Sequence, residues 1–271
     1  MDMATLIPLV GLLLGIGALA GVLAGLLGVG GGIVLVPAFY YTFSGLGYDS
    51  PELMQICLAT SLATIIVTSA RSVSSHNKKG AVEWSILRGW APGIVIGAVI
   101  GVLVAAQLRS TTLQGIFGGL GFTIGLYMLF GRNRWQLADE MPGLGLRSAL
   151  STLVGFLSVL MGIGGGSFGV PIMTLHGVPI HRAVATAAGF GAIIAIPSVI
   201  AFLFVKIAVA PPWTVGAVNL PAFLVVIAMT TLTAPLGAKI AHGLDPKPLK
   251  RVFGVFLLVI AGNMLRKSLG Y

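Results

Sequence analysis

The chain has 271 residues, of which 56% are hydrophobic and only 8% are charged, whereas a soluble domain carries about 25% charged residues. A soluble globule with so few charges could not cover its surface, so the composition excludes a cytosolic enzyme and a soluble nucleic-acid-binding protein. The net charge of +9 would indicate nucleic-acid binding in a soluble chain, and here it needs a different explanation.

Apolar segments long enough to cross a bilayer recur along the chain. A spanning helix needs roughly 20 mostly apolar residues, and six segments reach about this length, at residues 53–75, 84–107, 113–130, 183–205, 215–240 and 249–265. Regions 5–43 and 146–176 are also apolar, but a glycine cluster interrupts each, so we predict two helices that meet at a break in each region. The sequence therefore predicts an all-α polytopic membrane protein with about eight hydrophobic segments.

The N-terminal segment could alternatively be a cleaved signal peptide, because Ala18-Leu19-Ala20 has the spacing of small residues found at cleavage sites. A signal peptide begins with basic residues, but Asp2 is the first charge here. We expect this segment to be retained.

An internal repeat organises the chain. Gly28-Val29-Gly30-Gly31-Gly32, followed by Pro37, recurs in the second half as Gly162-Ile163-Gly164-Gly165-Gly166, followed by Pro171 at the same spacing. Leu58-Ala59-Thr60-Ser61 recurs as Val184-Ala185-Thr186-Ala187 at a shorter offset, because a connection at 45–52 is longer in the first half. Later matches, such as Leu113 with Leu249, keep the same order. We predict two homologous four-segment halves, 1–130 and 146–271, joined by a cytoplasmic linker at 131–145.

The distribution of lysine and arginine distinguishes parallel from inverted halves. If each glycine-broken region crosses the membrane once, 10 of the 16 basic residues fall on one face. If each region is a re-entrant hairpin, the second half is inverted and 12 of the 16 fall on one face. Basic residues gather on the cytoplasmic side, so we favour inverted repeats that each begin with a re-entrant hairpin. Parallel halves stay the alternative, and the sorting accounts for the positive charge.

The two glycine clusters are the strongest candidate binding sites. A helix that restarts after a glycine break presents free backbone N–H groups and a positive dipole end, which together bind anions. Close helix packing through small residues is the alternative reading. The predicted anion site comprises Gly30, Gly31, Gly32 and Ile33 in the first half, and Gly164, Gly165, Gly166 and Ser167 in the second. Gly28, Pro37, Gly162 and Pro171 are predicted hinge or structural residues.

Polar residues within the spans supply further candidates. Thr60, Ser61 and Thr186 lie on repeat-related helices and are predicted to line the pocket, unless they only bond a carbonyl one turn back. Arg71 and Arg182 could bind the anion, or could be ordinary cytoplasmic charges. No acidic residue lies in the middle of a predicted span, and no catalytic or metal-ligating constellation is apparent. We therefore expect neither an enzyme, nor a metal site, nor a cofactor.

The two glycine motifs with their prolines, together with Ala59-Thr60-Ser61, resemble the TauE/SafE sulfite exporter family of membrane transporters over nearly the whole chain. The resemblance implies about eight hydrophobic segments and a small sulfur-containing anion as substrate. Ala187 stands where the first half has Ser61, so the two halves would contribute unequal hydroxyl groups to a pocket.

These observations predict a secondary transporter that moves sulfite, sulfoacetate or another organosulfonate by alternating access. An anion channel, or a transporter of a non-sulfur organic anion, is the alternative. The expected location is the cell (inner) membrane, with several crossings. The expected partners are the lipid bilayer and a small anionic substrate, without nucleic acid, and a homo-oligomer is left open.

Overall fold

The computed structural model describes residues 11, 13–23, 31–131, 137–243 and 246–270, with the backbone alone at 235, 238–243 and 246–250. The N-terminal helix Leu13–Leu23 comes first. The other helices are α2 (Gly32–Gly45), α3 (Leu53–Asn77), α4 (Trp84–Ala105), α5 (Ser110–Phe130), α6 (Leu144–Leu160), α7 (Gly166–Leu175), α8 (Ile180–Phe202), α9 (Leu220–Gly243) and α10 (Pro246–Ser268). The predicted helical class is confirmed. In the described part of the chain, α3, α4, α5 and α8 are long and apolar enough to cross a membrane.

A short β-hairpin lies where the predicted segment 215–240 was expected to begin. Strands β1 (Thr214–Val215) and β2 (Val218–Asn219) pair antiparallel, and α9 starts only at Leu220. Gly216 has a φ of 57°, which glycine adopts without steric cost and which suits a tight hairpin turn. Asn219 then caps α9, because its Oδ1 accepts the N–H of Ala222 at 3.0 Å. An asparagine at this position is a strong helix start signal.

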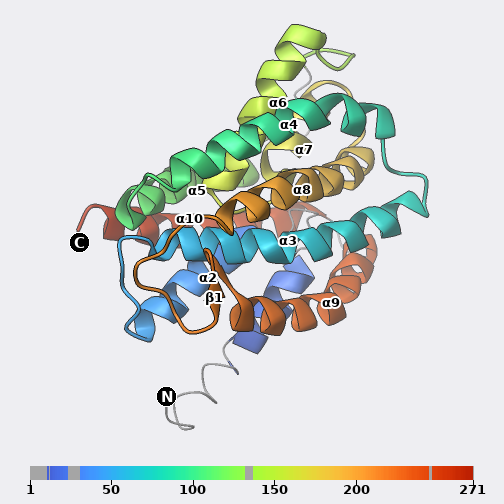
Figure 1. Ribbon diagram of the computed structural model, residues 1–271. Helices are drawn as coiled ribbons and strands as arrows, with labels where there is room; N and C mark the ends of the chain where they lie inside the picture. The colour runs from blue at the N-terminus through green and yellow to red at the C-terminus, as the bar shows by residue number, and fades with distance from the viewer. Residues whose placement is uncertain (1–10, 12, 24–30, 132–136, 244–245, 271) are drawn as a thin grey trace.

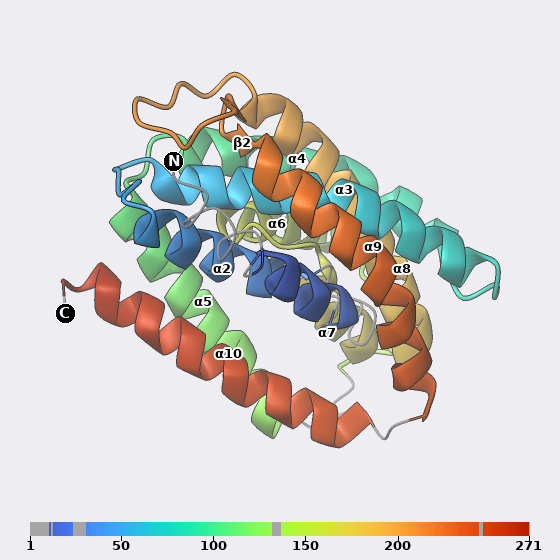
Figure 2. The same ribbon diagram turned by 90° about the horizontal axis from the view of Figure 1, so that it is seen from below.

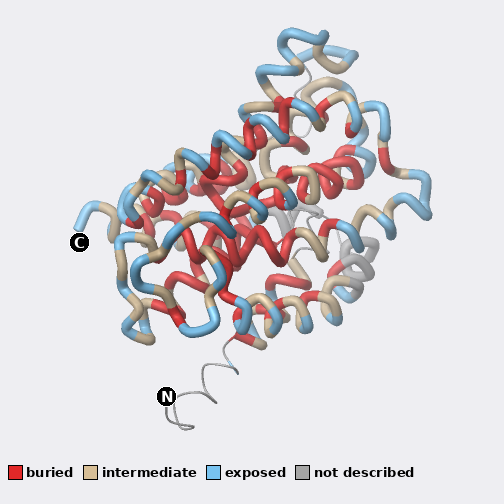
Figure 3. The backbone as a smooth tube through the Cα atoms, in the orientation of Figure 1, coloured by how far each residue is buried: buried red, intermediate tan, exposed pale blue. Residues whose placement is uncertain are grey.

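The long helices pack as neighbouring pairs. Helix α3 lies beside α8 in the middle of the molecule, α5 lies beside α10, and α4 lies beside α6 (Figures 1 and 2). The N-terminal helix packs on α9, since a Cβ on Gly17 would lie 3.0 Å from the Cβ of Met229. Buried residues concentrate in the middle of the molecule and exposed residues at its margins (Figure 3).

Glycines bring the helices of two pairs into close contact. On α4, Gly93, Gly97 and Gly101 are buried against α6, and a Cβ on Gly97 would overlap the carbonyl of Thr152. On α5, a Cβ on Gly118 would lie 2.6 Å from Cγ of Leu265. Small residues at such spacing let membrane helices approach closely. The outer face of α4 instead exposes large apolar side chains, namely Val95, Ile96, Val99, Ile100 and Leu103, as expected of a surface that faces lipid.

The molecule has two distinguishable ends. At the first, which we call the linker end, the N–H of Leu137 donates to the carbonyl of Leu175 at 2.7 Å. This bond joins the linker between the halves to the end of α7. At the second, which we call the loop end, the connection between α2 and α3 meets the connection between α4 and α5. There, the N–H of Ser110 donates to the carbonyl of Pro51 at 2.7 Å.

Candidate functional site

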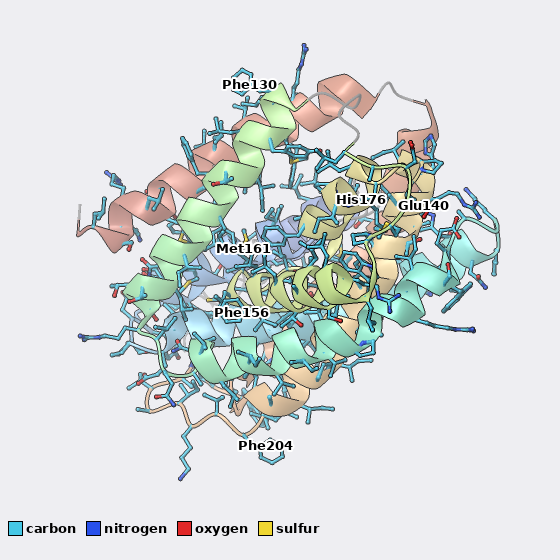
Figure 4. All side chains as sticks on the ribbon, turned by 90° about the horizontal axis from the view of Figure 1, so that it is seen from above. Phe130, Glu140, Phe156, Met161, His176 and Phe204 are labelled. Carbon is cyan, nitrogen blue, oxygen red and sulfur yellow. The ribbon has the colours of Figure 1, made fainter. Side chains whose placement is uncertain are left out.

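The second glycine break forms a tight turn between α6 and α7. Gly162 has a φ of 62°, and its N–H donates to the carbonyl of Val159 at 2.9 Å. Residues 161–166 are all buried, and Met161 lies in the interior of the molecule, whereas Phe130 and Phe204 point outward (Figure 4). The predicted break is therefore a turn in the buried interior, and α7 restarts directly after it.

The start of α7 presents a series of donors without protein partners. No described residue accepts a hydrogen bond from the amide N–H groups of residues 164–168, and the first bonded amide is that of Gly169. The Oγ of Ser167 is buried and also has no partner among the described residues. Buried donors are costly unless a ligand or water satisfies them. The positive end of the helix dipole points the same way as these donors, and the predicted anion site at this position stays a prediction.

The first glycine break meets the second. Gly31, with a φ of 72°, precedes α2, and no described residue accepts the amide N–H groups of Gly32 and Ile33. A Cβ on Gly32 would lie 2.5 Å from the carbonyl oxygen of Gly162 and 2.9 Å from Cα of Ile163. The backbones of the two breaks are thus in direct contact. Gly28 and Gly30 lie outside the described residues, so their predicted roles stay predictions.

Helix α3 supports this contact. The Oγ of Ser61 donates to the carbonyl oxygen of Gly162 at 2.7 Å, and a Cβ on Gly162 would lie 3.0 Å from Cα of Leu58. Ser61 thereby satisfies one of the buried carbonyl groups of the turn. Its repeat counterpart Ala187 has no hydroxyl group, so this bond has no equivalent on α8.

The two repeat-related threonines occupy equivalent positions. The Oγ1 of Thr60 accepts the N–H of Asn219 at 3.0 Å, and the Oγ1 of Thr186 accepts the N–H of Glu83 at 2.9 Å. Both threonines are fully buried. Each therefore ties a helix of one half to the start of a helix of the other, α3 to α9 and α8 to α4. Their predicted contact with substrate stays a prediction.

Replacing Thr60 by valine should cost stability rather than affinity. Thr60→Val keeps the shape of the side chain but leaves the buried N–H of Asn219 without an acceptor, which costs about 1–3 kcal/mol. We expect the melting midpoint of the purified protein to fall by several degrees, at about 2–4 °C per kcal/mol, with the ligand dissociation constant unchanged. Thr123→Val is the control, since Thr123 is exposed and bonds only the carbonyl of Gly119 in its own helix. A weakened ligand affinity without a lower melting midpoint would show that Thr60 contacts the substrate.

The two predicted arginines lie away from the glycine breaks. Nη1 of Arg182 pairs with Oε1 of Glu83 at 2.9 Å, and both side chains are partly exposed. Nη1 of Arg71 lies 3.5 Å from the carbonyl oxygen of Thr231. Pro235, four residues later, has no amide N–H to donate to this carbonyl in the helix. Arg71 is ten residues beyond Ser61 on α3, which is about 15 Å along the helix axis. The structure therefore brings the glycine breaks and Ser61 together, and it places both arginines near the linker end.

Two polar residues near the breaks were not predicted from the sequence. The N–H of Asn219 donates to Oγ1 of Thr60, and its side chain caps α9. The repeat offset that relates Leu113 to Leu249 also relates Glu83 to Asn219, so the repeat could have revealed the importance of Asn219. Ser158 on α6 is fully buried, and its Oγ has no partner in the described chain. No signal in the sequence distinguishes it from a serine that bonds its own helix.

Comparison with known proteins gives a consistent result. The family model described as "Sulfite exporter TauE/SafE" matches residues 13–264. A probable membrane transporter protein of Haemophilus influenzae is 34% identical over 257 residues, which cover 93% of this chain and 96% of the relative. A probable membrane transporter protein of Methanocaldococcus jannaschii is 28% identical over 256 residues, which cover 94% of each chain. No solved structure matches the chain significantly.

Proposed function

The chain belongs to the sulfite exporter TauE/SafE family of multi-pass membrane proteins, and from that premise we propose that it is a secondary transporter of a small sulfur-containing anion such as sulfite, sulfoacetate or another organosulfonate. The observation that carries this proposal is the start of α7, where five successive amide N–H groups and the buried Oγ of Ser167 have no partner in the described chain. Sulfite and sulfonate oxygens accept several hydrogen bonds at once, which suits such an array.

The charges around the breaks favour an anion. In the described chain, acidic residues lie only in connections or at helix starts, at Asp49, Glu52, Glu83, Asp139 and Glu140. No carboxylate therefore repels an anion in the middle of the described helices. Arg71, near the linker end, would attract the anion toward that entrance by long-range electrostatics, whereas Glu83 compensates the charge of Arg182.

The contacts between helices support two inverted repeats. Helix α6 starts beside the linker and α7 returns to it, since Leu175 bonds Leu137. The N-terminal helix runs parallel to α9, because Gly17 lies near Val226 and Val22 lies near Gly237. Since α9 runs toward the linker end and α6 runs away from it, the N-terminal helix and α6 run in opposite directions. The two broken segments would then approach from opposite ends, with their breaks in contact between them. Inverted halves with broken helices at the centre are a recurrent transporter design.

The burial of the second break supports alternating access. Residues 161–166 are buried from solvent, and Ser167 and Phe168 are half-buried, so movement of the surrounding helices would widen the access of an anion to the start of α7. Movement of α2 and α7 against α3 and α8 would open the site to one end at a time. An anion channel needs a continuous pore through the same position, and burial of residues 161–166 and of Gly31 and Gly32 favours the transporter.

A ligand-stabilisation screen tests the substrate class. Purified protein in detergent is heated with sulfite, with sulfoacetate, or with malonate, a dianion of similar size that lacks sulfur. A specific ligand at 100 times its dissociation constant stabilises by about 2.7 kcal/mol, which raises the melting midpoint by roughly 5–11 °C. We expect this rise with a sulfur anion and a smaller one with malonate. Stabilisation by malonate alone would instead support a non-sulfur organic anion.

A further inference from the structure

A cleft of about 490 Å³ opens at the loop end, and Leu53 in its wall is eight residues before Ser61 on α3, which is about 12 Å along the helix axis. Its walls come from the end of α2, the connection between α2 and α3, and the start of α5. The connection is the part of the first half that is longer than its counterpart in the second. The residues that line the cleft are different from those of the central site.

Opposite charges face this cleft without neutralising each other. Asp49 and Arg109 both line it and are both exposed. Neither forms an ion pair with any residue that the structure describes. Unpaired charges of both signs in one cleft suit a ligand that carries both signs itself.

The walls of the cleft are held in place and offer further polar groups. The Oγ of Ser110 donates toward the carbonyls of Ser50 and Pro51, at 3.1 and 2.9 Å, and it accepts the N–H of Met54 at 2.9 Å. These bonds fix the connection to the start of α5. The Oγ of Ser50 is buried and has no described partner, and Gln114 on the facing helix is only 3% exposed.

A positive charge on α10 reinforces one side of the cleft. Nζ of Lys267 lies 5.1 Å from the ring centroid of Tyr40, which lines the cleft, and 5.0 Å from that of Tyr41. This cation–π contact fixes the tyrosine wall. Arg109 and Lys267 therefore bring positive charge to the cleft, and Asp49 and the neighbouring Glu52 bring negative charge.

We propose that the cleft binds a small zwitterion, with its anionic group on Arg109 and its ammonium group on Asp49. The volume lies within the range of small-molecule sites, roughly 300–1,000 Å³, and both charged groups of the ligand would find a partner of opposite sign. If the zwitterion is a transport substrate, the cleft is the place where it first binds at this end, and only this interpretation rests on the proposed function. The binding itself is independent of transport.

Two ligands that differ in one group test the proposal. They are 2-aminoethanesulfonate, a zwitterion, and 2-hydroxyethanesulfonate, in which a hydroxyl replaces the ammonium group. Their dissociation constants are measured by calorimetry on the purified full-length protein. We expect the zwitterion to bind roughly tenfold more tightly, as one hydrogen bond between charged groups allows. Asp49→Asn should remove this preference, and Arg109→Gln should weaken the binding of both ligands.

Matched variants separate the cleft from the central site. Lys206→Gln and Glu140→Gln remove exposed charges elsewhere, and they should leave both dissociation constants unchanged. Ser167→Ala at the start of α7 should also leave the zwitterion preference intact. Equal binding of the two ligands, no binding of either, or a preference lost in Ser167→Ala but kept in Asp49→Asn would each overturn the proposal. Absence of transport would count against the proposed function and would not alter these binding results.

Discussion

Gly32→Ala should reduce transport to less than about a tenth of the wild-type rate, because overpacking of this kind costs roughly 1–3 kcal/mol. The added Cβ would lie 2.5 Å from the carbonyl oxygen of Gly162 and 2.9 Å from Cα of Ile163. Both neighbours are backbone atoms of the other break, so no side chain can rotate away to make room. The methyl group would push the two breaks apart at the point where they meet. The rate is measured as uptake of a radiolabelled sulfonate into proteoliposomes.

The controls for this experiment are glycines in open surroundings. A Cβ on Gly119 of α5 or on Gly262 of α10 would meet nothing within 4 Å, so Gly119→Ala and Gly262→Ala should transport at the wild-type rate. Size-exclusion chromatography and the melting midpoint verify that Gly32→Ala is folded. Folded Gly32→Ala that transports as fast as Gly119→Ala would show that contact between the breaks is not required.

Ser167→Ala should weaken binding of the sulfur anion by about 10- to 100-fold and leave folding stability unchanged. The Oγ of Ser167 is buried at the start of α7 and has no partner in the described chain, so its removal breaks no bond of the unliganded protein. A hydrogen bond from this hydroxyl to a charged ligand is worth about 1.5–3 kcal/mol. Titration calorimetry gives the dissociation constant, and the melting midpoint without ligand gives the stability.

Ser148→Ala is the matched control for this loss. Ser148 is an exposed serine on α6 whose Oγ bonds the carbonyl of Leu144 in its own helix, and its replacement should change neither quantity. Unchanged affinity in Ser167→Ala would remove this hydroxyl from the substrate site. A lower melting midpoint without ligand would mean that Ser167 has a structural role instead.

Local sequence signals predicted the helices and the second break well. The cluster Gly162–Gly166 interrupts an apolar region, and glycine tolerates the φ of 62° that the turn requires at Gly162. The start of α9 was placed too early, because Val215, Ala217 and Val218 continue an apolar pattern that fits a helix as well as a strand. Asn219 sets the start of α9 through its capping hydrogen bond to Ala222, and the hydropathy of the segment does not indicate this bond.

Contacts between distant residues could not be predicted in the same way. Hydropathy does not show that Ser61 bonds the carbonyl of Gly162, or that Arg182 pairs with Glu83. The internal repeat could have predicted the paired bonds of Thr60 and Thr186, since both acceptors and both donors recur at repeat offsets. The cleft at Arg109 depends on a connection that is longer in the first half than in the second, so the internal repeat could not reveal the cleft.

Counterflow in proteoliposomes tests the central claim most directly. Purified protein is reconstituted into vesicles loaded with unlabelled sulfite or sulfoacetate, and radiolabelled anion is added outside. We predict transient accumulation of label above equilibrium, saturable with external anion and greatly reduced in Gly32→Ala, because a binding site that faces one side at a time exchanges its ligand. Vesicles that accumulate no label, or that pass the anion as a non-saturating electrical current without counterflow, would contradict a secondary transporter of sulfur anions.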